Sequence, residues 1–118
     1  MGAPHGLAQR RISRSARAAA VGVAFLLAVD VNRLLRRAGW YAARAEPDLR
    51  QWLDLVALGT VCDVVPLYGI NRAFVTQGLK IMSRRGNPGL RAIGDAAGLT
   101  GPATARDLGF VIGPRINA

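Results

Sequence analysis

The chain has 118 residues, which is enough for one small domain and too few for a cleft between two full domains. Hydrophobic residues make up 51% of it and charged residues 19%, a composition that predicts a folded chain and excludes an intrinsically disordered one. The 16 basic side chains exceed the 7 acidic ones by nine, and Lys80 is the only lysine. Because arginine donates paired hydrogen bonds to phosphate oxygens, this excess favours a polyanionic partner such as nucleic acid, although a solvated basic face explains it equally well.

Two residue types that often carry chemistry are almost absent. Cys62 is the only cysteine, which excludes an intramolecular disulfide and a thiolate metal site and fits a reducing cytoplasm. His5 is the only histidine and lies near the N-terminus, which excludes a catalytic histidine on a rigid element. Any catalytic or metal-binding role must therefore depend on carboxylates.

Residues 1–17 combine Gly, Pro, Ser and Arg without apolar periodicity, and we interpret them as a basic N-terminal arm without a candidate site. The apolar run that follows imitates a signal peptide, but it ends at Asp30 after about a dozen residues, too few to cross a bilayer. The helical spacing then continues to Arg37. The pattern predicts a largely buried helix that ends at Gly39 as a left-handed cap; a membrane-associated helix over 18–31 is the alternative.

Three further helices are predicted from apolar residues at helical spacing. The second begins near Pro47 and places Leu49, Trp52, Leu53, Val56 and Ala57 on one face. The others span Asn71–Arg85 and Gly89–Ala97, the last ending at Gly98. Since no useful run alternates with a period of two, the chain is expected to be mainly helical.

Asp63 is the acid that the pattern singles out. It lies in the segment 58–67, where Gly59 interrupts the helical spacing, apolar residues flank the acid, and Pro66 follows. A carboxylate is costly to bury unless it is hydrogen-bonded, paired or bound to metal. From the pattern alone a helix cap or a buried hydrogen bond is favoured and a metal ligand is the alternative, while Asp54 is expected to be an exposed helical acid.

Other candidates are weaker. Gly59 and Thr60 suggest a phosphate loop, but the remaining residues of that motif are absent, so a glycine that permits tight helix packing is favoured. Arg115 follows a Gly-Pro pair and is a candidate phosphate contact or a solvated side chain. The aromatic residues Trp40, Tyr41 and Trp52 are candidates for stacking on bases, with anchors in a hydrophobic core as the favoured alternative.

The run from Leu53 to Leu67, LDLVALGTVCDVVPL, closely resembles a signature segment of the RecJ exonucleases in the DHH phosphoesterase superfamily. Further segments extend the resemblance in the expected order: Gly22–Leu27, Asn71–Ala73, Gly78–Leu79, Pro88–Ala92, Leu108–Phe110 and Gly113–Ala118. The resemblance therefore covers the chain from about Val21 to its end.

This resemblance implies roles for two residues. The family aspartate that matches Asp63 helps to hold a divalent metal, Mn²⁺ or Mg²⁺, and the arginine that matches Arg115 lies beside the nucleic-acid path. Cys62 replaces the alanine that is common in the family; because both side chains are small, the replacement is expected to have little effect on this segment. The implied activity is 5′-to-3′ hydrolysis of single-stranded DNA in recombination and repair, in the cytoplasm.

The departures from the family imply an internal fragment. Its aspartate-rich and Asp-His-His motifs have no counterpart here, and His5 matches neither. Residues 18–118 correspond to the C-terminal part of the α/β DHH catalytic domain, without most of its central sheet, and end before the C-terminal nucleic-acid-binding domain. Residues 1–17 do not resemble the family, which suggests a shifted reading frame or a misplaced start.

No complete catalytic site is expected in this chain, because two-metal hydrolysis needs several ligands and Asp63 is one. Activity would require a companion chain that carries the missing motifs. Helices that normally cover the sheet would expose apolar faces and promote self-association. The alternative function is that of a non-catalytic, basic helical protein that binds nucleic acid through its arginines.

Overall fold

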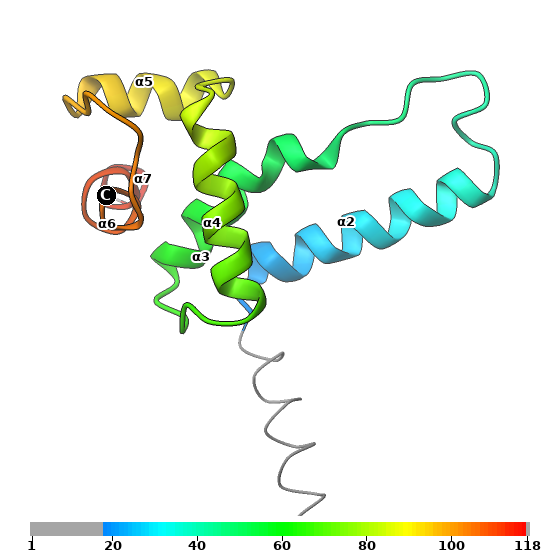
Figure 1. Cartoon of the computed structure of the whole chain (residues 1–118), viewed down its shortest axis with the longest axis horizontal. Helices are drawn as coiled ribbons and strands as arrows, with labels where there is room; N and C mark the ends of the chain where they lie inside the picture. The colour runs from blue at the N-terminus through cyan, green and yellow to red at the C-terminus, as the bar shows by residue number, and fades with distance from the viewer. Residues whose placement is uncertain (1–17, 118) are drawn as a thin grey trace, which may run out of the picture.

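The computed structural model describes residues 18–117, and that part of the chain consists of helices and connecting loops without a β-strand (Figure 1). In chain order the helices are α2 (Ala20–Arg37), the 3₁₀ turn η1 (Leu49–Trp52), α3 (Leu53–Cys62), α4 (Ile70–Ser83), α5 (Pro88–Ala96), α6 (Ala105–Asp107), the π-helical turn η2 (Leu108–Ile112) and α7 (Gly113–Ile116). The expectation of a mainly helical chain is confirmed. The predicted arm over 1–17, with His5, lies outside the described residues, as does Ala118.

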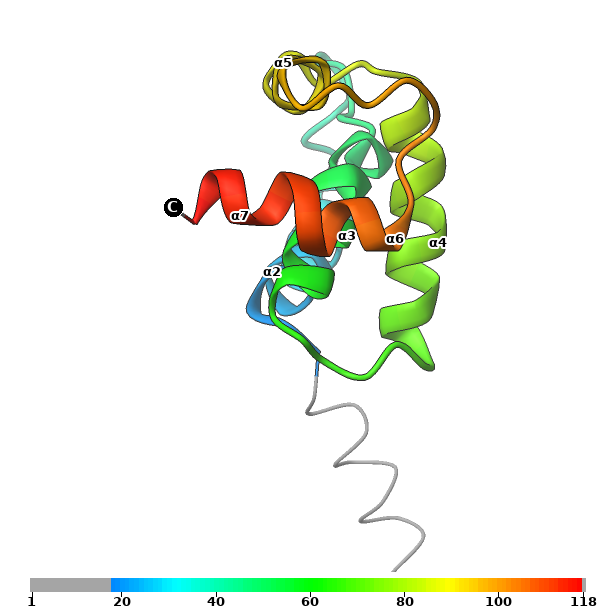
Figure 2. The ribbon, with the colours of Figure 1, turned by 90° about the vertical axis from the view of Figure 1, so that its left-hand side faces the viewer.

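The core forms where α3 packs against α4 and against the C-terminal helices. Gly78 on α4 lies so close to α3 that an added Cβ atom would overlap the carbonyl oxygen of Leu53 and the Cβ of Ala57, so only glycine fits there. Figure 2 shows the run from α6 to α7 crossing α3. The buried core residues are Ala57, Leu58, Leu90, Leu108 and Ile112. These residues belong to α3, α5 and η2, and the partly buried Leu79 and Met82 of α4 pack against them, so four helical elements contribute to one small core.

Helix α2 contacts this core only through its N-terminal half. Val21 packs on Gly59 of α3, and the ring of Phe25 meets that of Phe74 edge to face, with centroids 5.7 Å apart. The helix then projects away from α3 and α4 (Figure 1). Its exposed apolar side chains are Val23, Leu26, Leu27, Val29, Val31 and Leu34. The prediction of a largely buried helix is therefore wrong for the described part of the chain, because nothing in that part packs on the outer face of α2.

The far end of α2 has the predicted glycine cap. Gly39 has a φ of +76°, its N–H donates to the carbonyl of Arg36, and the N–H of Trp40 donates to that of Leu35. These two bonds satisfy carbonyls that the end of a helix would otherwise leave unpaired. Of the helices that the structure describes, none is long and apolar enough to cross a membrane.

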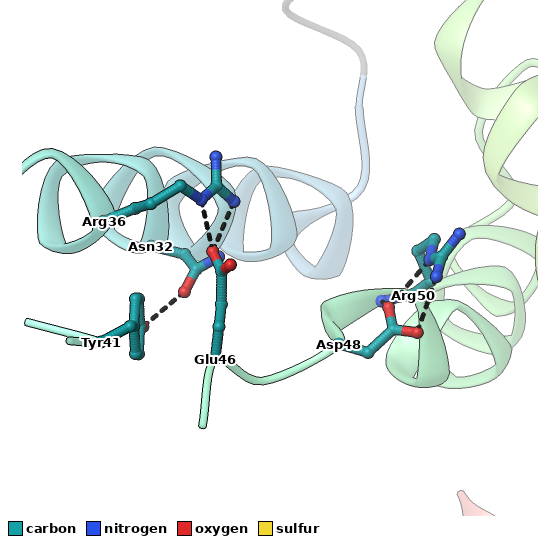
Figure 3. A network of polar contacts seen from close by, with 6 residues as sticks. All are labelled: Asn32, Arg36, Tyr41, Glu46, Asp48 and Arg50. Carbon is teal, nitrogen blue, oxygen red and sulfur yellow. Dashed lines mark hydrogen bonds and ion pairs between the residues drawn. The ribbon is translucent and has the colours of Figure 1, made fainter. Parts of the chain in front are cut away.

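A polar network returns the chain from this cap to the core (Figure 3). The buried Asn32 accepts a hydrogen bond from the Tyr41 hydroxyl and donates one of 3.1 Å to Glu46. Arg36 also pairs with Glu46, and this contact lowers the pKa of the Glu46 carboxyl. The segment 38–48 contains no helix or strand. The contacts of Tyr41 and Glu46 with α2 therefore hold it in place.

Two other details differ from the sequence predictions. Helix α3 continues through Gly59 instead of breaking there. An added Cβ at this position would lie 2.6 Å from a methyl group of Val21 on α2. The glycine permits a close helix contact, as the favoured interpretation held. The short helices after Thr104 were not predicted; they begin at a capping box between Thr104 and Asp107.

Candidate functional site

The buried acid of this structure is Asp54, where the sequence pattern led us to expect an exposed one. Asp54 is 3% exposed, and one of its carboxylate oxygens accepts a 2.7 Å hydrogen bond from the N–H of Leu55. Burial raises the pKa of the Asp54 carboxyl, while hydrogen bonds from the backbone and from Asn87 oppose that shift. Asp54 is in the first turn of α3, where Gly78 of α4 packs against Leu53 and Ala57 and where Asn87, just before α5, hydrogen-bonds the Asp54 carboxylate.

Asp63 lies at the opposite end of α3 and is exposed. It is the C-cap residue, and its N–H donates to the carbonyl of Gly59. The cap role of the favoured interpretation is therefore confirmed, through the backbone of Asp63. The alternative of a buried hydrogen bond is wrong, because Asp63 is exposed and its carboxylate makes no hydrogen bond to any residue in the range 18–117. The next residue, Val64, has a φ of +54° and is 88% exposed. The positive φ of Val64 is incompatible with a helix, so α3 cannot continue beyond Asp63. A β-branched residue rarely adopts such a φ angle.

Arg115 lies on α7, close to this end of α3. The first residue of α7, Gly113, lies against the side chain of Cys62. The thiol of Cys62 donates to the carbonyl of Leu108 across 3.8 Å, and burial raises the pKa of this thiol, which favours its neutral form. The guanidinium of Arg115 is exposed and donates to the carbonyl of Val111 at 2.8 Å. The fold therefore brings together the two segments that carry the predicted site residues.

Comparison with known proteins gives a consistent match. No protein-family model matches the chain. The chain is 51% identical over 108 residues to the single-stranded-DNA-specific exonuclease RecJ of Dickeya dadantii, 46% identical over 104 residues to that of Escherichia coli, and 40% identical over 97 residues to that of Thermus thermophilus. The first two matches cover 85% of this chain and the third covers 82%.

The chain is a RecJ fragment. It spans 18% of the length of the first two relatives and 13% of the third. The resemblance found in the sequence is thereby confirmed, and so is the conclusion that this chain corresponds to a part of the longer RecJ proteins. Because the chain spans so small a part of these relatives, the match does not by itself assign their catalytic activity to it.

The described part of this RecJ segment does not fit a complete metal site. Mn²⁺ and Mg²⁺ favour several oxygen ligands at once. Among residues 18–117 no group of three or more His, Cys, Asp or Glu side chains comes together in a way that could hold an ion. Asp63 offers one carboxylate, and Asp54 is enclosed at the other end of α3. No step of hydrolysis can therefore be assigned to these residues by themselves.

The remaining sequence candidates have clear positions in the segment. Gly59 and Thr60 lie inside α3 and Thr60 is fully buried, which excludes a phosphate loop there. Trp40 and Trp52 are 50% and 49% exposed, so the favoured interpretation of both as core anchors is wrong. The guanidinium of Arg44 lies 3.9 Å from the centre of a Trp40 ring. The sequence pattern kept base stacking only as the less favoured alternative for both, because a pattern does not show which side chains other elements cover.

Proposed function

We propose that the chain supplies one helical segment of a metal-dependent exonuclease that digests single-stranded DNA from the 5′ end during recombination and repair in the cytoplasm. The observation that carries this proposal is the match to RecJ proteins over 85% of the chain, which includes the run around Asp63. The exposure of Asp63 supports it, since a carboxylate that shares a metal with another part of a protein must be accessible.

In such an enzyme Asp63 would be one ligand of Mn²⁺ or Mg²⁺, and Arg115 would contact a phosphate of the DNA. Metal ions in sites of this kind activate water and stabilise the leaving oxygen. The other ligands would come from a companion chain that carries the motifs missing here. The contact between Gly113 and Cys62 would hold Arg115 at the same end of α3 as Asp63. Without the companion, the chain is expected to be inactive.

The test is manganese-dependent digestion of 5′-phosphorylated single-stranded DNA. The purified chain is assayed alone and with a polypeptide that contains the remaining RecJ motifs. We expect no digestion by the chain alone and digestion by the mixture, which Asp63→Ala should reduce by at least about 100-fold. Activity of the chain alone that Asp63→Ala abolishes would contradict its incompleteness. Failure of every mixture with a folded partner would contradict the proposal itself.

A second candidate function is that of a non-catalytic protein that binds nucleic acid. It is favoured by basic residues that have no acidic partner: Arg33, Arg36, Arg50 and Arg85 form ion pairs, whereas Arg72 and Lys80 form none within residues 18–117. Binding that falls steeply with salt, together with a lack of nuclease activity in every mixture, would favour this function over the first.

A further inference from the structure

We infer that the exposed side of α4, together with a hollow beside Trp52, binds a single-stranded polynucleotide at a place separate from Asp63 and Arg115. The cations of α4 would contact phosphates, and Trp52 would stack on a base. The inference shares the identity of the polymer with the proposed exonuclease, and it uses Arg72 and Lys80, which also favour the second candidate function. It requires no metal and no hydrolysis.

The cations form a row along α4. Arg72, Thr76, Lys80 and Arg84 follow one another at intervals of four residues, and all four are exposed. On an α-helix such residues share one side, with a rise of about 6 Å between neighbours and about 18 Å from first to last. The buried residues of α4, including Phe74, Val75 and Gly78, face the core instead. The row is therefore available to a long, extended ligand.

The charge of this row is not opposed by acids on the same helix. Helix α4 contains no Asp or Glu. Arg72 and Lys80 have no acidic partner among the described residues, and Arg84 has only a longer-range interaction with Asp48. Elsewhere in that part of the chain, arginines such as Arg36 and Arg85 pair directly with acids. A row of unpaired cations creates a local positive potential that attracts a polyanion.

Helix stability does not explain the position of Arg72. It lies in the first turn of α4, where the N–H groups carry partial positive charge and a cation is unfavourable. Lys80 and Arg84, at the other end, complement the helix dipole. If the row served only to stabilise the helix, its first member would not be basic. A ligand that spans the whole helix accounts for all three cations.

The row ends at a hollow of about 640 Å³ between η1 and the C-terminal end of α4. This volume is within the usual range for small-ligand sites. Its lining includes the half-exposed Trp52, the amides of Gln77 and Asn87, and the guanidinium groups of Arg50 and Arg84. Two acids also line it: Asp48, which is paired with Arg50 at 2.9 Å, and the buried Asp54. An aromatic face beside cations is the combination that binds bases of a single strand without sequence preference.

The hollow and Asp63 lie at opposite ends of α3. Trp52 precedes the helix and Asp63 follows its ten residues, a rise of about 15 Å. The 63–69 loop reverses the chain, so α4 begins near the end of α3 that Asp63 caps and runs back towards the start of α3 (Figure 1). Arg72 is in the first turn of α4, and Arg84, which follows the helix, lines the hollow. One strand could therefore run along α4 from the hollow towards Asp63. The inferred surface would bind the polymer away from the reacting end.

The test is binding of a fluorescein-labelled 20-mer of deoxythymidine to the purified chain in EDTA, measured by anisotropy over a series of salt concentrations. The variant Arg72→Gln/Lys80→Gln/Arg84→Gln should bind at least about 10-fold more weakly at 0.1 M salt, and the slope of log K against log salt should fall by about two. The control Arg37→Gln/Arg91→Gln/Arg106→Gln removes the same charge from other exposed sites and should change binding by less than about threefold. Equal losses in both triple variants would overturn the inference, since binding would then depend only on net charge.

A second measurement tests the hollow without disturbing the cations. In a Trp40→Phe background Trp52 is the only tryptophan, and its emission should be quenched when the 20-mer binds. The variant Trp52→Leu should bind at least about fivefold more weakly. Unchanged emission at saturation, or equal affinity for duplex DNA, would overturn the stacking contact. RNA of the same length should bind with similar affinity, since neither phosphate contacts nor stacking recognises the sugar; a strong preference for one polymer would contradict this surface.

The outcome is separable from that of the proposed function. Binding of the 20-mer is measured in EDTA and requires no metal, whereas digestion requires Mn²⁺ and the ligands of a companion chain, so either result can be obtained without the other. A failed digestion assay with intact binding would refute the exonuclease role alone. Circular dichroism of each variant checks that its helices have formed.

Discussion

Gly113, the first residue of α7, lies so close to Cys62, the last residue of α3, that a Cβ atom on Gly113 would come within 2.5 Å of the Cys62 sulfur. The same Cβ would lie 2.8 Å from the carbonyl oxygen of Leu108, which accepts the thiol hydrogen bond. This contact fixes α7 on the end of α3. It therefore determines where Arg115 stands relative to Asp63.

Gly113→Ala should destabilise the fold by about 1–3 kcal/mol, because the added methyl group overpacks a contact that cannot relax without moving α7. In an open helix position the same change would stabilise by up to about 1 kcal/mol, so the sign of the effect is informative. Urea unfolding measures it. The matched control is Gly101→Ala, where an added Cβ has no neighbour within 4 Å and the expected change is within about 0.5 kcal/mol. Equal effects at the two sites would contradict the close packing.

Asp54 should make stability depend on pH. Burial raises the pKa of its carboxyl above the ordinary value of 3.8, so between the two pKa values the folded chain holds more protons than the unfolded chain. The stabilising contribution is therefore complete below about pH 3.8 and is lost as the pH rises through the folded-state pKa. Asp54→Asn cannot ionise, so its stability relative to the parent should be higher at pH 7 than at pH 3.5.

Urea unfolding of both proteins at the two pH values gives this difference directly. Glu46 and Asp48, whose pKa values are lowered by Arg36 and Arg50, contribute stability that is lost as the pH falls. Those contributions are the same in both proteins and cancel in the comparison. If the difference in free energy of unfolding between the two proteins is the same at pH 3.5 and pH 7, burial does not raise the pKa of Asp54.

How far the sequence predicts this structure is clear from particular residues. The ends of α2 and α5 were predicted to within about two residues, because Gly39 and Gly98 adopt the positive φ angles that a helix stop requires. The prediction for the two acids was wrong: Asp63 was expected to be enclosed and is exposed, whereas Asp54 was expected to be exposed and is buried. Flanking apolar residues suggested that Asp63 is enclosed, but enclosure depends on which elements pack there, and α4 covers Asp54 instead. Tertiary contacts of this kind leave no periodic signal in the chain.

The role of Asp63 depended on the resemblance and not on spacing. Its immediate neighbours gave no reason to prefer a metal ligand, and the structure places no second ligand beside it among residues 18–117. The C-terminal helices were missed for a different reason. They are short, they include a π-helical turn, and Gly109, Gly113 and Pro114 weaken any helical pattern.

Tyr41→Phe should loosen the segment 38–48. The Tyr41 hydroxyl donates to Asn32, and its loss leaves a buried amide oxygen without that donor, at a cost of about 1 kcal/mol. Tryptic cleavage after Arg44, within this segment, should therefore become about fivefold faster. Cleavage after Arg91 in α5 is the internal control and should not change. Equal acceleration at both sites would indicate global unfolding instead of local release.

The outer face of α2 should make the isolated chain self-associate. Val23, Leu27, Val31 and Leu34 recur at helical spacing and are between 47% and 64% exposed. An apolar stripe of this length is uncommon on the surface of a monomer, and burying it between copies would remove it from water. Sedimentation velocity should show association that increases with concentration, and Leu27→Glu should shift the chain towards monomer.

The neighbouring substitution Ala28→Glu adds the same charge on another side of α2 and should leave the association almost unchanged. Because both positions are exposed and lie away from the core, each variant should retain the parental free energy of unfolding of the monomer within about 0.5 kcal/mol. A parent chain that remains monomeric at high concentration would contradict the prediction. Equal loss of association in both variants would show that added charge, rather than the stripe, controls it.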